Sequence, residues 1–135
     1  MSSTGDWREN EMSIELNHTI VAARDKRRSA VFLTELFGLP EAKPAGPFLA
    51  VQVSNNVALD YADVAGEVTS QHYAFLVGED DFESIFARIR ERQLPYYADP
   101  QHRMVGEINE RSGGRGLYFE DPDGHNMEIM TRSAG

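Results

Sequence analysis

The chain has 135 residues, a net charge of −9, 41% apolar and 26% charged residues, and no cysteine. This length suits one domain around a single core. The lack of cysteine excludes disulfides and thiolate chemistry, and the negative charge argues against nucleic acid, whose phosphates are bound by neutralising them. No stretch approaches the ~18 consecutive apolar residues of a membrane helix. We therefore expect a cytoplasmic protein with no nucleic-acid or membrane partner.

Residues 1–12, MSSTGDWRENEM, lack an apolar run and are expected to form a flexible tail rather than a signal peptide. The domain is expected over residues 13–133. Within it the chain repeats itself, which divides the domain into module one (13–66) and module two (67–133). Each module starts with a polar residue and a histidine before a short apolar run, and each closes its helical pattern on Leu-Pro.

In module one the run after His18 predicts a strand, and Asp25 is expected to cap a helix that ends before Pro40. The alternation in residues 48–63 predicts a hairpin around Asn55–Asn56. A two-residue turn there would place Asp60 opposite Val51, on the core face of the sheet. A slip of one residue would instead place Asp60 in solvent.

Module two follows the same order. The run after His72 predicts a strand, Asp80 and Asp81 are expected to cap the next helix, and a long polar loop leads to a second hairpin, RGLYFEDPDGHNMEIM. The second strand of that hairpin carries Glu128 among apolar neighbours, where an ionised carboxylate is costly without a positive partner. Glu128 occupies the place that Asp60 has in module one. Because neither module can bury its own sheet face, the two are expected to pack together.

The motifs LNHTIV, HYAFLVGEDDFESIFARI and YFEDPDGHNMEI resemble the vicinal oxygen chelate superfamily of glyoxalases, bleomycin-resistance proteins, extradiol dioxygenases and fosfomycin-resistance enzymes. The resemblance implies an α+β fold of paired βαβββ modules that form a cupped mixed sheet with helices outside, often completed by dimerisation. It also implies that His18, His72 and Glu128 hold a metal. Two imidazoles and one carboxylate suit a divalent ion such as Fe, Mn, Ni or Zn with open positions for substrate.

The predicted hairpin places Tyr118 across from Glu128, because both are equidistant from Asp123. A phenol beside the metal would serve as an acid/base group or a donor to substrate; the alternative is an aromatic side chain packed on the cup wall. Asp60 is a candidate fourth ligand with one methylene less reach than glutamate. His18 and His72, taken singly, would also suit core histidines.

Two histidines and three arginines in the loops are further candidates. His125 is expected at the surface or stabilising its turn, and His102 is either solvated or able to swing over the cup. An arginine near Gly113–Gly114 would suit an anionic substrate, although a surface arginine is the alternative; the candidates are Arg103, Arg111 and Arg115.

The resemblance favours a divalent-metal enzyme that chelates two oxygens of a small substrate, by dioxygenase-like or Lewis-acid chemistry. Asp60 argues against a glyoxalase, and Ile20 argues against fosfomycin resistance, where the family has threonine. The alternative is a metal-free protein that binds a drug or metabolite, as bleomycin-resistance proteins do. A homodimer is expected from the family.

Overall fold

The computed structural model describes residues 12–133, so the predicted tail lies outside the described residues except for Met12. Module one forms β1 (His18–Ala23), α2 (Lys26–Phe37), β2 (Lys43–Ala45), β3 (Phe48–Gln52) and β4 (Ala58–Asp63). Module two forms β5 (His72–Leu76), α3 (Glu79–Glu91), the 3₁₀ helix η1 (Arg111–Gly113), β6 (Gly116–Glu120) and β7 (Asn126–Met130). Neither α-helix within residues 12–133 is long and apolar enough to cross a membrane.

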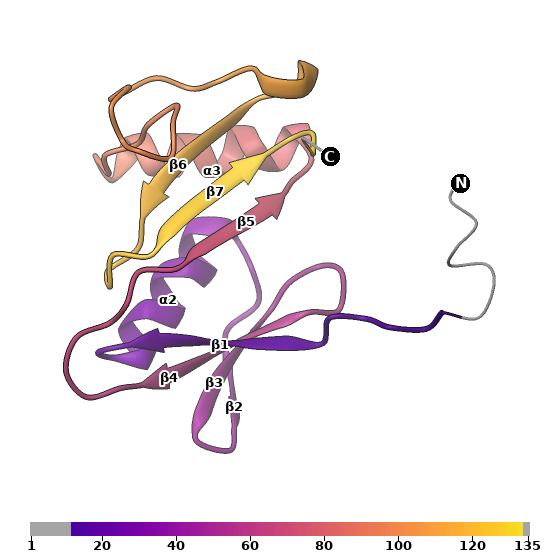
Figure 1. Cartoon of the computed structure of the whole chain (residues 1–135), viewed down its shortest axis with the longest axis vertical. Coiled ribbons are helices and arrows are strands. Elements are labelled where there is room, and N and C mark those ends of the chain that lie inside the picture. The colour runs from indigo at the N-terminus through magenta and orange to yellow at the C-terminus, as the bar shows by residue number, and fades with distance from the viewer. Residues whose placement is uncertain (1–11, 134–135) are drawn as a thin grey trace.

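The strands form two mixed sheets, one per module, in the orders β1-β4-β3-β2 and β5-β7-β6 (Figure 1). The predicted α+β class is confirmed, and the two modules match: β1 runs parallel to β4 as β5 does to β7. Module two replaces its second strand with isolated bridges from Tyr97 to Val105 and Tyr118. The sheets are open rather than curled into the predicted cup, because the edge strands β1 and β5 share no ladder.

Local sequence explains the helix ends in one module better than in the other. Asp25 caps α2 as predicted, accepting from the backbone N–H groups of Arg27 and Arg28 at 3.1 and 3.2 Å. The predicted caps of α3 are wrong, because Gly78 is its N-cap and makes no side-chain bond. Asp80 and Asp81 lie in the first turn instead, where their charge complements the positive end of the helix dipole.

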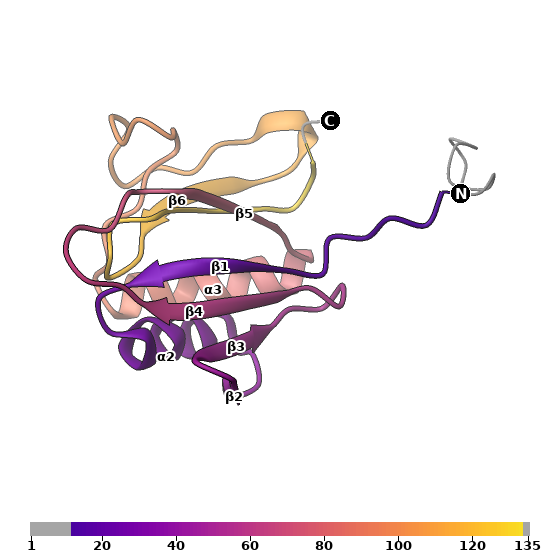
Figure 2. The same cartoon turned by 60° about the horizontal axis from the view of Figure 1, so that its bottom comes forward.

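Each helix covers one face of its own sheet, and no helix covers the opposite faces, which are called the uncovered faces below (Figure 2). The first core packs Leu33 of α2 against Val51 and Tyr61, and the second packs Phe82 and Ile89 of α3 under β6 and β7. The two cores meet at aromatic side chains, since the Phe37 and Phe75 rings stand edge to face with centroids 5.0 Å apart. This shared packing supports the predicted single domain, which stays a prediction.

The turn between β6 and β7 ties module two to module one. His125 is fully buried there; its Nδ1 accepts from the Gln71 N–H at 3.0 Å and its Nε2 donates to the Ala22 carbonyl at 2.8 Å. The Asp123 carboxylate accepts from the Arg24 backbone N–H at 3.0 Å and from the Ser29 hydroxyl at 2.5 Å. His125 therefore stabilises its turn as predicted, but not from the surface, because it joins both modules.

We expect Asp123→Ala to lower the free energy of unfolding by about 2–3 kcal/mol, because it leaves the buried Ser29 hydroxyl and the Arg24 N–H without their acceptor. Urea unfolding followed by circular dichroism measures this loss. Glu67→Gln is the control, since Glu67 is exposed and exposed changes stay within about 0.5 kcal/mol. Equal midpoints for the two variants would contradict an anchoring role for Asp123.

Candidate metal and substrate site

The uncovered face of the second sheet brings His72 and Glu128 together. His72 opens β5 and Glu128 lies on the neighbouring β7, with His72 Nε2 3.0 Å from Glu128 Oε1. The His72 side chain is 49% exposed and that of Glu128 is 12% exposed. Met127 and Ile129 face the core on the other side of the sheet. The carboxylate therefore avoids the apolar core by strand alternation, and an imidazole is its partner.

Tyr118 completes this group, and its predicted pairing with Glu128 across the β6–β7 hairpin is observed. Its ring lies 5.9 Å from the His72 ring and is almost fully buried, while its hydroxyl accepts from Arg111 Nη1 at 3.1 Å. Burial raises the pKa of the Tyr118 hydroxyl, and the nearby Glu128 carboxylate raises it further, although Arg111 acts in the opposite direction. Tyr118 is therefore a protonated donor at neutral pH.

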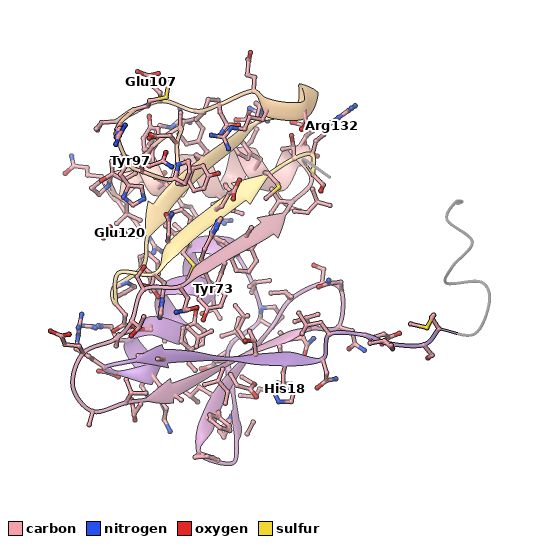
Figure 3. All side chains as sticks on the ribbon, viewed as in Figure 1. His18, Tyr73, Tyr97, Glu107, Glu120 and Arg132 are labelled. Carbon is pink, nitrogen blue, oxygen red and sulfur yellow. The ribbon has the colours of Figure 1, made fainter. Side chains whose placement is uncertain are left out.

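His18, the third predicted ligand, lies apart from these residues in a single chain. It is on the exposed face of the other sheet, where its Nδ1 is 2.8 Å from Asn17 Oδ1 (Figure 3). β1 and β5 point in opposite directions (Figure 1), and each histidine is the first residue of its strand. Within residues 12–133, no three His, Asp or Glu side chains gather closely enough to hold an ion.

Asp60 lies on the same uncovered face as His18. The hairpin turn holds three residues, 54–56, with Asn56 in the left-handed region at φ 67°, and the Val53 N–H donates to the Val57 carbonyl. Asp60 consequently pairs with Ala50 instead of the expected Val51, and its side chain faces away from the core. Asp60 beside Ile20 thus repeats the placement of Glu128 beside Ala74, which confirms the symmetry of the modules.

The long loop between α3 and β6 is anchored beside Asn126, the first residue of β7. His102 stacks on Tyr97 with ring centroids 4.1 Å apart, and its Nε2 is 2.9 Å from Asn126 Oδ1. The Asp99 carboxylate accepts from the backbone N–H groups of Arg103 and Met104 at 2.7–3.0 Å. Of the two expectations for His102, neither a solvated nor a swinging side chain describes this fixed arrangement.

The three candidate arginines have separate environments. Arg103 is exposed on the loop, and Arg115 pairs with Glu79 at 2.9 Å and with Glu83. Arg111 alone among them bonds a site residue, Tyr118. Sequence reasoning grouped the three, since proximity to Gly113–Gly114 could not show which acids α3 would bring to Arg115.

The spacing of His72 and Glu128 is that of two ligands of one divalent ion with octahedral geometry. Two ligand atoms about 2.1 Å from one ion and at right angles to each other are about 3 Å apart, which matches the 3.0 Å between His72 Nε2 and Glu128 Oε1. A nitrogen and a carboxylate oxygen suit Fe, Mn, Ni or Zn. The exposed position of His72 leaves room for a further ligand and for substrate.

The chain belongs to the Glyoxalase/Bleomycin resistance protein/Dioxygenase superfamily, whose profile matches residues 15–129. This confirms the predicted family, whose named relatives include enzymes. Oxidase ChaP-H1 shares 57% sequence identity and a TM-score of 0.90, covering 91% of this chain and 99% of that structure. Oxidase ChaP-H2 shares 60% identity and a TM-score of 0.90, covering 92% and 98%. Glutathione transferase FosA of Serratia marcescens is 32% identical over 125 residues, or 87% of this chain and 81% of the relative.

Acid should loosen the loop that ends at the site. Although burial acts in the opposite direction, the backbone N–H groups of Met104 and Arg103 hold the pKa of Asp99 below its usual value of 3.8. A lowered folded pKa means that the contribution of Asp99 is present above 3.8 and is lost as pH falls through the folded pKa. We expect the Arg103 and Met104 amides to lose protection from hydrogen exchange when the pH falls below the folded pKa of Asp99. The measured exchange rates are corrected for the intrinsic dependence of exchange on pH.

Asp99→Asn should remove this pH dependence at both amides, because an amide side chain does not titrate there. The Asn109 amide, bonded to the Gly116 carbonyl, is the internal control. Retained acid dependence at Arg103 and Met104 in the variant would assign the effect to another group.

Proposed function

We propose that this protein is a metal-dependent oxidase or oxygenase of its superfamily that acts on a small molecule through two of the substrate's oxygens. The observation that carries the proposal is the His72–Glu128 pair at 3.0 Å with Tyr118 buried beside it. The identity of 57–60% to two oxidases favours oxidation over the transferase and lyase chemistries of other superfamily members. Cytoplasmic location and a homodimeric state belong to the same proposal.

His72 and Glu128 would hold the metal, which as a Lewis acid would polarise and orient substrate oxygens. The chain's own residues supply the rest of the site. Burial and the Glu128 carboxylate raise the pKa of Tyr118, so it keeps its proton at neutral pH and can donate a hydrogen bond. Arg111 fixes the orientation of that hydroxyl by occupying a lone pair of its oxygen.

The third ligand, in this proposal, is His18 of a second copy. One chain brings two of the three predicted ligands together and leaves His18 exposed on the edge strand β1. Exposed apolar side chains lie on both edge strands: Leu16 and Ile20 beside His18 are 71% and 54% exposed, and Leu76 at the end of β5 is 66% exposed. Such side chains on unpaired edge strands favour burial against another chain. The second copy would also close the open sheets into the predicted cup.

Metal content tests the site. Wild-type protein is expected to hold about one equivalent of Fe, Mn, Ni or Zn per chain, measured by elemental mass spectrometry, and His72→Ala and Glu128→Gln are each expected to lose it. Glu120→Gln is the matched control, because Glu120 is an exposed acid on β6 outside the pair. A wild-type protein that stays empty after incubation with each ion would favour the alternative, a metal-free binding protein.

Complementation tests the origin of His18. His18→Ala and Glu128→Ala should each be empty alone, but after unfolding and refolding together the mixture should regain about a quarter of the wild-type metal content. Half of the randomly formed dimers then combine the two variants, and each combined dimer has one intact site. If all three ligands came from one chain, the mixture would stay empty.

A further inference from the structure

A cavity of about 330 Å³ is lined in part by Tyr118 and Glu128, and His72 does not line it. It is formed by the segment 109–115 and the end of β7, and Met130 supplies an apolar wall. Three of its lining residues are arginines: Arg111, Arg115 and Arg132. This concentration of positive charge contrasts with the net charge of −9 of the whole chain.

Within residues 12–133, Arg115 is the one arginine of these three that forms an ion pair. Arg115 is neutralised by Glu79 and Glu83 and rests against the Phe82 ring. Arg111 bonds the uncharged Tyr118 hydroxyl, and neither Arg111 nor Arg132 forms an ion pair with any acid in residues 12–133. The acid in the cavity wall is Glu128, which the proposed function assigns to the metal. Once Glu128 is so engaged, within the part of the chain that the structure describes Arg111 lines the cavity without an ion pair, and Arg132 has only its longer-range attraction to Glu79.

The segment that carries Arg111 is held in one shape. A Cβ on Gly114 would lie 2.6 Å from Thr131 Oγ1 and 2.9 Å from Arg132 Cβ, so the backbone passes too close to β7 for any other residue. The Arg115 N–H donates to Thr131 Oγ1 at 2.8 Å, and the Thr131 N–H donates to the Arg115 carbonyl at 2.8 Å. Ser112 accepts the left-handed region at φ 56° to make this turn. A fixed segment presents Arg111 with little ordering cost on binding.

We propose that this cavity binds a carboxylate of the substrate, with Arg111 as the principal donor and Arg132 adding charge. The planar guanidinium fork matches a carboxylate and binds it with two hydrogen bonds. The substrate class is therefore an organic acid whose oxygens reach the His72–Glu128 pair while its carboxylate occupies the arginine cavity. This inference rests on the proposed function for the position of the reacting end, and it goes further by naming a group of the substrate.

The test compares 2-naphthoate with its neutral counterpart 2-naphthamide by isothermal titration of wild type, Arg111→Gln, Arg132→Gln and Arg103→Gln, all loaded with zinc. Wild type is expected to bind the acid about tenfold more tightly than the amide, since a charge-assisted hydrogen bond contributes that much. Arg111→Gln should abolish the preference and Arg132→Gln should weaken it. Arg103→Gln, which removes an exposed arginine outside the cavity, should leave it unchanged.

The same titrations in the Glu128→Gln background separate this inference from the proposed function, because that variant removes the metal site but keeps the arginines. An acid preference there that depends on Arg111 supports the cavity even if no metal is bound by the wild type. A wild type that holds metal but binds acid and amide equally, or fails to bind the acid at about 10 mM, overturns the inference and leaves the proposed function intact. A preference that survives Arg111→Gln also overturns it.

Zinc content and thermal midpoint of Arg111→Gln should equal those of the wild type, because Arg111 is exposed and lies outside the proposed ligand set. Loss of both would show that Arg111 supports the fold rather than binding an acid, and would overturn the assignment.

Discussion

The hydrogen-bonded turn between β6 and β7 holds the functional arrangement together. Asp121 Oδ1 accepts from the backbone N–H groups of Asp123 and His125, which fixes the turn. A fixed turn sets the register of the hairpin and so places Tyr118 across from Glu128. The same turn reaches module one through His125 and Asp123, whose partners are Ala22 and Arg24. One short segment therefore aligns the site residues and docks the two modules.

The second general constraint is the division of each sheet into a covered and an uncovered face. The helices bury the face that carries Val51, Tyr61 and Ile129, so the polar residues of the repeat can occupy only the other face. Strand alternation then places His18 and Asp60 on one uncovered face and His72 and Glu128 on the other. Because the histidines stand on different sheets, the symmetry that makes the two halves equivalent also separates the predicted ligands His18 and His72 within a single chain.

The uncovered face of module two has two chemically different ends. The His72–Glu128 pair joins β5 to β7. The guanidinium groups lie just after β7 and in the segment before β6, and Tyr118 lies between the two groups. Tyr118 connects the two regions, because its hydroxyl accepts from Arg111 and the residue pairs with Glu128 across the hairpin. A substrate that bridged the two ends would pass over this hydroxyl.

Much of the strand and helix arrangement could be predicted from the sequence, because the repeat and the alternation of apolar residues are local patterns. The pattern around Pro122–Gly124 predicted the Tyr118–Glu128 pairing, and Asp25 predicted the start of α2. Prediction failed where several conformations suit the same residues. Asn55–Asn56 fits a two- or a three-residue turn, and the choice moved Asp60 to the other face. Asp80 and Asp81 are good caps by type, but the N-cap is Gly78, two residues before Asp80.

The sequence by itself determined the family, the module order and which residues share a strand face, because these follow from side-chain chemistry at fixed spacing. Tertiary structure alone decided which of those residues meet. His125 is buried between the modules, and His18 is separated from His72. Arg115 pairs with Glu79 and Glu83, whereas Arg111 bonds Tyr118. The reason is physical: such contacts join residues distant in the chain, and their distances depend on how two sheets dock, which no local pattern encodes.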